Sequence, residues 1–524
     1  MTNKYIYITL LAVLGFNAEA QGQELRNAPR LVVSITVDQL RSDYLEAFLP
    51  LYSENGFKKL LSDGTVYQNA SYPFAPVDRA SAMALISSGV TPYYNKIIGE
   101  RWLNRATLRP VNCVDDSKYP GLNTQDASSP NQLCTSTLGD ELKVATEGRS
   151  IVYSIAPNRD AAILSAGHAA NGAIWIDDNN GNWCSSTYFF STFPAWAQGY
   201  NNMLAPGKSI KEKTWEPINE LVGNFSYFMQ SGLKAPFKHA FKGDARFREY
   251  KTSGLINEDI TDMAIQCTAS CGMGTDRVTD LISITYYAGN FNHNAVTDCQ
   301  MELQDTYVRL DREIERLVKH LEDKLGKDNI LVVLTSTGYS NEGEADYERF
   351  RIPSGTFYLS RTSNLLNMYL GALWGQGKYV EAYFRNQIFL NHQLLETKKI
   401  SIAEATSRAQ EFLAMMSGVR NVYTSLQLIT DNNEHLQNIR NGFNAERCGD
   451  IVIETAPGWK LLNEDTQETE LSRASFTPFP VIFYGSGIKA ERITTPVTTD
   501  RIAPTIARAI RIRAPNACSV APLF

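Results

Sequence analysis

Few residues of this chain have a type and spacing that could do covalent chemistry. Asp38 directly follows an apolar run, Leu31 to Val37, and the stretch Ala75 to Gly89 reads APVDRASAMALISSG. Within that stretch Arg79 has no nucleophilic side-chain group, and Ser81 fits a helix-packing or capping role. The chain contains no GxSxG elbow and no Cys–His pairing, so neither standard nucleophile arrangement is indicated.

Five apolar runs have the length of strands that are buried on both faces of a sheet. They are separated by long segments, as expected for an α/β protein with a mainly parallel central sheet flanked by helices. The runs are Leu31 to Val37, Ile151 to Ile155, Leu281 to Tyr287, Ile330 to Thr335, and Val481 to Tyr484.

The most regular helical pattern lies between the third and fourth of these runs. Apolar residues recur at helical spacing from Leu303 to Leu321 with charges between them, and Gly326 is placed to end the helix. A strand, a helix and a strand with short joins predict a parallel βαβ unit.

One unit, residues 21–524, is expected to carry the sheet, with residues 363–454 as a largely helical insertion or cap. Ile402 to Met416 is its best-defined helix. Asp115 to Ser136 is rich in Ser, Asn, Asp and Pro and is predicted to be a loop.

Composition and the N-terminus predict an exported globular protein. The chain has 524 residues and a net charge of −6, and it carries no basic segment for nucleic acid or anionic lipid. Lys4, the apolar stretch Tyr5 to Phe16 and Ala18-Glu19-Ala20 resemble a signal peptide over residues 1–20. No later segment has the length of a membrane span, so periplasmic localisation is expected.

Eight cysteines in an exported chain favour disulfide bonds. Cys113 and Cys134 could close the Asp115 to Ser136 loop. Cys267 and Cys271 are four residues apart, which does not match a CxxC redox motif and does not support a zinc pair.

The motifs resemble those of the alkaline phosphatase superfamily, in its type I phosphodiesterase/nucleotide pyrophosphatase-like branch, and in particular the periplasmic zinc phosphatases of Bacteroidetes-type bacteria. The resemblance is strongest over Val33 to Tyr44, Gln304 to Thr335 and Pro480 to Lys489, and extends over nearly all of the mature chain. It implies two zinc ions, held by carboxylates and imidazoles, and a hydroxyl nucleophile.

Asp38 stands at the first carboxylate ligand of that family pattern, while Arg79 occupies the nucleophile position. The T-D-x-x-G-H motif aligns with Tyr286 and Asn290 in place of Asp and His. T-x-D-H-G aligns with Thr337 and Gly338, and the His of T-H-x-P falls on Pro478.

The phosphate-binding positions of the family pattern also differ. Its Asn falls on Glu100 in Gly99-Glu100-Arg101-Trp102, and its Lys and Arg fall on Asn158 and Asp160. A carboxylate at Glu100 or Asp160 repels a phosphate dianion. Of the six histidines, His293 is the one candidate for a displaced ligand, because it lies three residues past Asn290.

These substitutions predict a catalytically inactive family member, without zinc, that serves as a structural, adaptor or binding subunit for other periplasmic or outer-membrane proteins. One alternative is a zinc-dependent phosphomonoesterase or phosphodiesterase, which the overall resemblance implies. A second is a metal-free protein that binds a sugar or lipid headgroup.

Arg79 has two possible places in such a site. In one, its guanidinium supplies the positive charge of the metals and pairs with Asp38 and Glu100. In the other, its side chain points into solvent, as arginine usually does.

Overall fold

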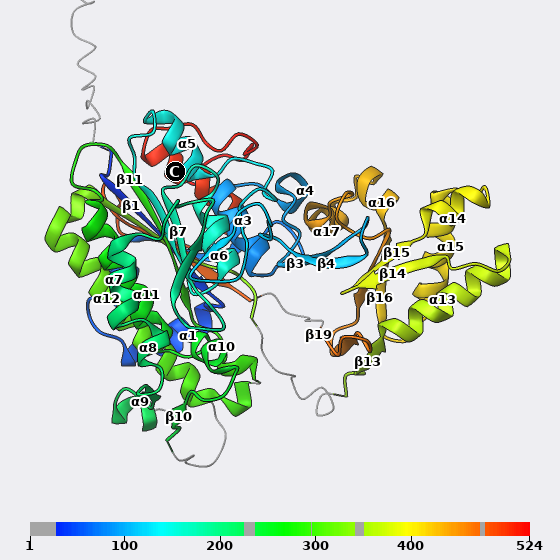
Figure 1. Cartoon of the computed structure of the whole chain (residues 1–524), viewed down its shortest axis with the longest axis horizontal. Coiled ribbons are helices and arrows are strands. Elements are labelled where there is room, and N and C mark those ends of the chain that lie inside the picture. The colour runs from blue at the N-terminus through cyan, green and yellow to red at the C-terminus, as the bar shows by residue number, and fades with distance from the viewer. Residues whose placement is uncertain (1–27, 225–235, 295, 341–350, 472–476) are drawn as a thin grey trace, which may run out of the picture.

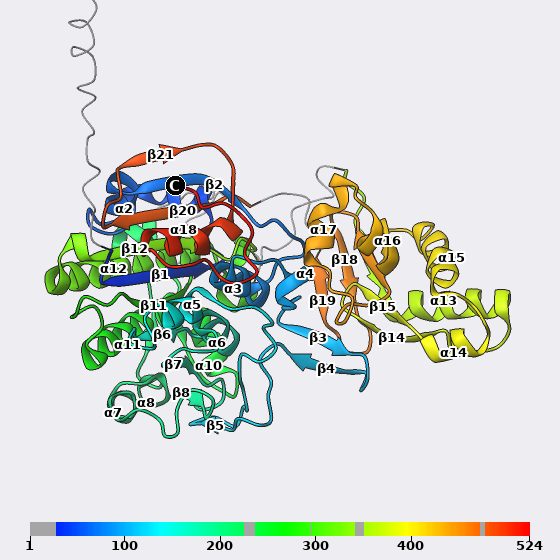
Figure 2. The same cartoon turned by 90° about the horizontal axis from the view of Figure 1, so that it is seen from above.

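Strand β1 (Leu31–Asp38) lies in the middle of a large mixed sheet in the computed structural model, which describes residues 28–224, 236–294, 296–340, 351–471 and 477–524. Its neighbours β11 (Asp280–Tyr287) and β12 (Ile330–Ser336) both run parallel to it. Figure 2 shows the strands side by side across the larger lobe. In order they are β21 (Glu491–Ile493), β2 (Thr65–Ser71), β20 (Phe479–Gly485), β12, β1, β11, β6 (Val152–Ile155), β7 (Gly172–Ile176), β8 (Trp183–Ser186) and β5 (Gly121–Leu122), with β22 (Val497–Thr498) paired to β2.

The predicted strands and the α/β class are confirmed. Each of the five apolar runs coincides with a strand of this sheet, and β1, β6, β7, β11 and β12 are parallel. Strand β20 is antiparallel to both β12 and β2, so the sheet is mixed at that edge. The apolar runs are continuous because helices cover both faces of the sheet.

Alternation along β1 divides the core between the two faces of the sheet. Leu31, Val33, Ile35 and Val37 enter one apolar cluster, and Val32 enters another. The helices over the first face are α1 (Ser42–Ala47), α2 (Phe57–Asp63), α7 (Ala195–Met203), α10 (Arg246–Lys251), α11 (Ile256–Cys271) and α12 (Gln300–Leu325). Those over the other are α3 (Arg79–Ser88), α5 (Leu138–Ala145), α6 (Arg159–Ala166) and α18 (Ile502–Ala509).

Helix α12 confirms the predicted βαβ unit. It follows β11 and precedes β12, and it ends at Leu325, where Gly326 adopts a φ of +84°. Because β1 lies between β11 and β12, the helix crosses over β1 to connect two strands that are not neighbours.

The segment 363–454 has more helix than strand, but it also contains a sheet that the sequence did not indicate. It contains α13 (Leu359–Trp374) from Ser363 onward, but also a four-stranded sheet beside the helices in the smaller lobe (Figure 1). The strands are β14 (Val380–Phe384), β15 (Gln387–Leu390), β16 (Val419–Thr424) and β17 (Ile451–Thr455), and the other helices are α14 (His392–Thr397), α15 (Ile402–Ala414), α16 (Ser425–Thr430) and α17 (Gln437–Gly442).

Short strands explain why the sequence did not indicate this sheet. Strand β16 is buried at three consecutive residues, Val422 to Thr424, and so lacks the alternation that identifies a strand from sequence. The turn between β14 and β15 contains Arg385 and Asn386, with Arg385 at a φ of +51°, and neither residue is the glycine that usually marks such a hairpin. The proposed limits of the insertion remain a prediction. Next to this insertion, a further small sheet is formed by β13 (Gly355–Tyr358), β18 (Trp459–Leu462) and β19 (Thr469–Leu471).

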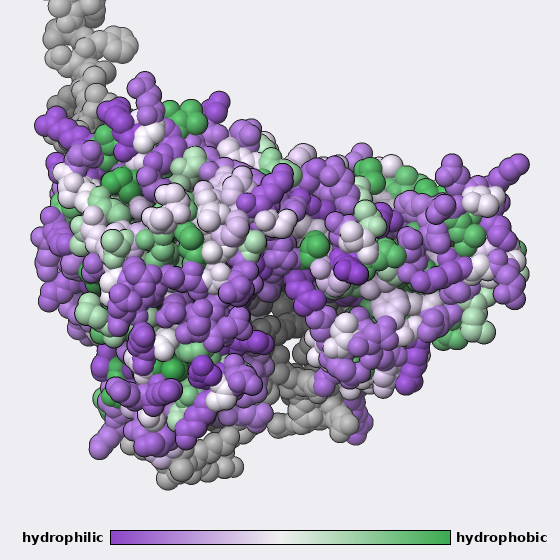
Figure 3. All heavy atoms as spheres, in the orientation of Figure 1, coloured by the Kyte–Doolittle hydropathy of each residue, from purple (hydrophilic) through white to green (hydrophobic). Residues whose placement is uncertain are grey.

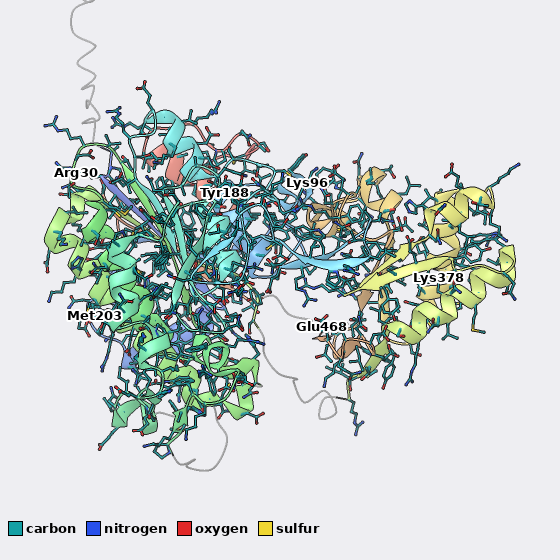
Figure 4. All side chains as sticks on the ribbon, viewed as in Figure 1. Arg30, Lys96, Tyr188, Met203, Lys378 and Glu468 are labelled. Atoms are coloured by element: carbon teal, nitrogen blue, oxygen red, sulfur yellow. The ribbon has the colours of Figure 1, made fainter. Side chains whose placement is uncertain are left out.

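A hairpin of the larger lobe reaches the smaller one. Strands β3 (Arg101–Asn104) and β4 (Arg109–Asn112) extend toward β14 and β15 in Figure 1, and Arg105 at their turn pairs with Asp450 at 3.1 Å. Arg447 stacks over the Trp102 ring at 4.4 Å, and Lys96, labelled between the lobes in Figure 4, lies 2.6 Å from Glu446. Charged contacts therefore hold the two lobes together.

The eight cysteines form no disulfide bond, which corrects the prediction of loop-closing bridges; all eight belong to the part of the chain described above. Cys113 is buried in an apolar cluster, whereas Cys134 is exposed, and each thiol faces a nearby oxygen at 3.7 Å. An even number of cysteines does not place two sulfur atoms in contact.

Residues 1–20, the predicted signal peptide, lie outside the described residues. Among the residues that the structure describes, no helix combines the length and apolarity needed to cross a membrane. The surface in Figure 3 mixes hydrophilic and hydrophobic side chains over both lobes.

Candidate functional site

The candidate site lies at the carboxyl ends of β1 and its two neighbours. Asp38 is the last residue of β1, in register with Tyr287 of β11, and Thr337 directly follows β12. Open α/β sheets bind ligands at this edge, because the strands end there and loops converge. The sheet thereby places a buried carboxylate at the centre of the site.

Arg79 enters the site from the first turn of α3. Asp78 caps this helix by accepting from the backbone N–H of Ser81 at 3.0 Å, while the Ser81 hydroxyl accepts from the Asp78 backbone. This reciprocal cap fixes where the helix begins. It also confirms the capping role expected of Ser81, whose side chain is fully buried.

The Arg79 guanidinium lies among three carboxylates. Its Nε and Nη2 donate to the two Asp160 oxygens at 2.9 and 3.0 Å, which is a bidentate pair. Nη1 lies 3.7 Å from Asp38 and Nη2 lies 3.7 Å from Glu100. With a side chain only 16% exposed, Arg79 does not point into solvent, so the pairing hypothesis is confirmed and its alternative is wrong.

Neighbouring charges and burial shift the pKa values of Arg79 and Asp38 in opposite directions. Burial alone lowers the pKa of Arg79, but the carboxylates of Asp160 and Glu100 outweigh it and raise the pKa well above its usual value. The guanidinium is therefore always charged. For Asp38, burial dominates and raises the pKa, although the Arg79 charge and the Thr337 hydrogen bond oppose it.

One oxygen of Asp38 has no hydrogen bond. Oδ1 accepts from the Thr337 hydroxyl at 2.9 Å, whereas Oδ2 is buried and has no donor in the described structure. Likewise, Arg79 Nη1 donates no hydrogen bond to any described residue. A buried acceptor and an unused donor thus lie 3.7 Å apart, and such a pair calls for a water or ligand between them.

The smaller lobe contributes a second arginine. Arg385, in the β14–β15 turn, lies 3.4 Å from Asp78, and the other contact of that carboxylate oxygen is the backbone N–H of Glu100 at 2.7 Å. Asp78 therefore links the start of α3, the Glu100 segment and the smaller lobe.

Five of the residues singled out from sequence do not join this cluster. Tyr286 is in the core with its hydroxyl 2.9 Å from the Thr261 hydroxyl, and the Asn290 amide donates to the Asn294 carbonyl. Gly338 has a φ of +68°, and a Cβ there would meet the Tyr72 ring at 2.5 Å, so packing requires glycine. Asn158 precedes α6 without a capping hydrogen bond, and the Pro478 carbonyl accepts from Ser42.

Two site residues were missed from the sequence. Tyr339 interacts with the Asp38 carboxylate and acts to lower the pKa of that group, and its place two residues after Thr337, past a strand end, was a usable signal. Arg385 belongs to a segment distant in sequence, and no local pattern could have associated it with Asp78.

The described residues do not fit a two-zinc site. Among them, no three His, Cys, Asp or Glu side chains are grouped as metal ligands. A guanidinium lies where the carboxylates converge, and a second cation there would be repelled. His293 lies on an exposed turn after Asn290 and belongs to no such group.

Helix α6, which carries Asp160, is anchored at its other end by His168. The helix ends at Gly167, and the His168 ring then lies 3.0 Å from Asp140 at the start of α5. The hydrogen bond to Asp140 raises the pKa of His168. Burial raises the pKa of Asp140, but the His168 hydrogen bond and other donors outweigh it and lower that pKa.

Comparisons with known proteins agree with this architecture. The chain matches the type I phosphodiesterase / nucleotide pyrophosphatase family over residues 32–476. It is 27% identical to alkaline phosphatase PhoV of Synechococcus elongatus and 28% identical to alkaline phosphatase PafA of Elizabethkingia meningoseptica, with 98% of each chain covered in both cases. A crystal structure of wild-type alkaline phosphatase PafA superposes with a TM-score of 0.82 at 26% identity, covering 95% of this chain and 98% of that one.

These similarities correct the predicted function. The sequence led us to expect an inactive structural, adaptor or binding subunit, whereas PhoV and PafA, which are similar to this chain over 98% of their length, are named alkaline phosphatases. A protein of Myroides odoratus that is 27% identical over 96% of this chain is named a calcium-transporting ATPase. The comparisons favour the alternative of a phosphomonoesterase or phosphodiesterase. The expectation weighed the substituted positions and gave too little weight to similarity along the entire chain.

Replacing Arg79 by Ala is expected to lower the free energy of unfolding by about 3–5 kcal/mol, because it leaves buried Asp38 and Asp160 without their cation. Urea unfolding followed by circular dichroism measures the change. Arg408→Ala is the matched control, because it breaks an exposed pair with Glu411 worth at most about 1 kcal/mol. Arg79→Ala together with Asp160→Ala should cost less than the sum of the two single changes. A loss no larger than that of Arg408→Ala would contradict this prediction.

The His168–Asp140 pair should make stability depend on pH. Since the pKa of His168 is raised on folding, its contribution is complete below the ordinary value of about 6.5 and is lost as pH rises through the folded pKa. His168→Gln should therefore destabilise the protein more at a pH of about 6 than of about 8. Unfolding free energies at both pH values test this, with His435→Gln, an exposed histidine, as the control. Equal losses at the two pH values would show that the pair does not supply the dependence.

Proposed function

The chain belongs to the type I phosphodiesterase / nucleotide pyrophosphatase family, and we propose that it is a phosphoric ester hydrolase that acts on diesters in preference to monoesters. The observation that carries the proposal is similarity over 98% of the chain to named alkaline phosphatases. Family membership alone does not choose a substrate, so the preference is argued from the charges of the site.

The charges of the site favour a substrate with a single negative charge. Arg79 is one cation among Asp38, Glu100 and Asp160, and these carboxylates repel a phosphomonoester dianion. A phosphodiester carries one negative charge at neutral pH and suffers less of this repulsion. Arg79 Nη1, which donates to no described residue, is the donor available to a phosphoryl oxygen.

Asp38 is the residue placed to activate water. Its Oδ2 is a buried acceptor without a hydrogen bond, 3.7 Å from Arg79 Nη1. A water molecule between them would donate to Asp38 while Arg79 holds the phosphoryl oxygen, so that Asp38 acts as general base. Burial raises the pKa of Asp38, which makes the carboxylate a stronger base. Since a zinc pair does not fit the described residues, the proposed reaction uses no zinc.

The test compares bis(4-nitrophenyl) phosphate with 4-nitrophenyl phosphate, using the full chain after EDTA treatment and again after zinc addition. We expect hydrolysis of the diester with a higher kcat/KM and no stimulation by zinc. Asp38→Asn, which keeps the shape of the side chain, should lower kcat/KM by about 10²–10⁴-fold. Arg79→Ala should lower it by about 10²–10³-fold.

Arg408→Ala is the control for activity, because Arg408 is exposed on α15 and its partner is Glu411. Rates equal to the blank for both substrates, with and without zinc, would sink the proposal. Full activity in Asp38→Asn would identify a contaminating enzyme or another general base. Activity that requires zinc would overturn the metal-free reaction while leaving ester hydrolysis in place.

Periplasmic localisation and partners in the cell envelope remain predictions. The signal peptide lies outside the described residues, and the structure contains one chain.

A further inference from the structure

A cavity of about 230 Å³ lies in the smaller lobe at the point where it meets the larger lobe. One face of the sheet that contains β15, β16 and β17 lines it on one side, and α17 lines it on the other. Ala75 and Pro76 of the larger lobe also line it. Figure 1 shows α17 beside α4 (Pro92–Asn95) of the larger lobe, so the cavity is at the junction of the two lobes.

Strand pairing directs four side chains of this sheet toward α17. Val452 of β17 is in register with Tyr423 of β16, and both belong to the apolar cluster that includes Phe443, which directly follows α17. Glu454 is two residues further along β17 and is in register with Asn421, so it lies on the same face as Val452. Sheet geometry therefore places one carboxylate beside an apolar cavity.

Most of the cavity wall is apolar and buried. Phe443, Val452 and Leu461 line it and are only 2%, 7% and 4% exposed, and the Tyr423 ring adds further apolar surface. An apolar protein cavity of about 150 Å³ can hold a benzene molecule. This cavity therefore has room for an aromatic ring with a short side chain.

The wall that comes from the larger lobe is fixed by backbone contacts. The Ala75 N–H donates to the Asn438 carbonyl at 3.0 Å, and the Asn441 amide donates to the Pro73 carbonyl at 2.8 Å. A Cβ at Gly442 would meet the Ala75 carbonyl oxygen at 2.3 Å, so the two chain segments pass in close approach. The cavity is thus formed before any ligand enters it, as is usual for small-molecule sites.

Glu454 is the one charged residue among the described residues that line the cavity. Its Oε2 accepts from the Tyr423 hydroxyl at 2.7 Å and from the Asn421 amide at 2.8 Å, and its Oε1 lies 3.3 Å from Arg420 Nη1. The Arg420 side chain is 56% exposed, so solvent weakens that pair. A carboxylate has about four acceptor positions, which leaves Glu454 able to accept a further donor.

We propose that this cavity is a binding site for a primary organic amine, with an apolar body packed against Phe443 and Val452 and its ammonium group on the Glu454 carboxylate. The ammonium donates a charge-assisted hydrogen bond, and the face of the Tyr423 ring also attracts a cation. An organic carboxylate of the same shape is repelled by Glu454. This site goes beyond the proposed ester hydrolysis, and no described residue of the Arg79 cluster lines it.

Isothermal titration calorimetry of the full chain with 2-phenylethylamine, 2-phenylethanol and phenylacetate tests the class of ligand. The three compounds share a phenyl ring and have similar lengths, but they differ in charge. We expect the amine to bind about 10–100-fold more tightly than the alcohol, because a hydrogen bond to a charged group contributes more than a neutral one. Phenylacetate should not bind.

Single variants locate the binding. Glu454→Gln keeps the shape of the side chain and should reduce the affinity for the amine to that for the alcohol. Glu411→Gln, the same change at an exposed carboxylate of α15, is the matched control and should leave both affinities unchanged. Glu100→Gln should also leave amine binding unchanged, because Glu100 belongs to the other site. Val452→Phe places a ring in the cavity and should abolish binding of the amine and the alcohol; should this variant not fold, Glu454→Gln alone decides.

Three results would each overturn the proposal: equal affinities for the three compounds, no detectable binding of the amine, or amine binding that survives Glu454→Gln or a folded Val452→Phe. Loss of amine binding in Glu100→Gln would place the amine at the Arg79 cluster and would overturn the proposal as well. None of these measurements depends on ester hydrolysis, so the two proposals fail independently.

Discussion

The electrostatic balance around Arg79 is the constraint on which the candidate site depends. One guanidinium lies within ion-pair distance of Asp38, Glu100 and Asp160, and its side chain is only 16% exposed. Three carboxylates brought together without a cation would repel one another strongly in a low-dielectric cleft. Arg79 therefore has to be present and charged for the ends of β1, α3 and α6 to meet.

The ends of a strand and of two helices position these charged groups. Asp38 is placed by the end of a buried parallel strand, Arg79 by a capped helix start, and Asp160 by the first turn of α6. The cap residue Asp78 has a second function, because its other oxygen contacts Arg385 of the smaller lobe. Helix capping, the ion-pair cluster and the docking of the lobes are thus coupled through two adjacent residues, Asp78 and Arg79.

Similarity along the whole chain gives the fold, whereas the residues at the site decide which chemistry is possible there. The fold is shared with alkaline phosphatase PafA along 95% of the chain, since strand order and core packing tolerate many substitutions. The centre of the site is held by an internal cation. The proposed reaction uses a general base and a guanidinium, and these groups match singly charged esters better than dianions.

The sequence by itself determined the central sheet, the crossover helix α12 and the presence of Asp38 and Arg79 at strand and helix ends, because these depend on local periodicity and capping. Pairing of Arg79 with Asp38 and Glu100 was also within reach, from charge complementarity. Only the tertiary structure decided that Asp160 is the closest partner, that Arg385 reaches Asp78, and that Tyr286 turns into the core. The Asp160 and Arg385 contacts join residues that are 81 and 307 positions apart in the sequence. The orientation of Tyr286 depends on which face of a doubly buried strand its side chain takes. No local sequence pattern encodes either feature.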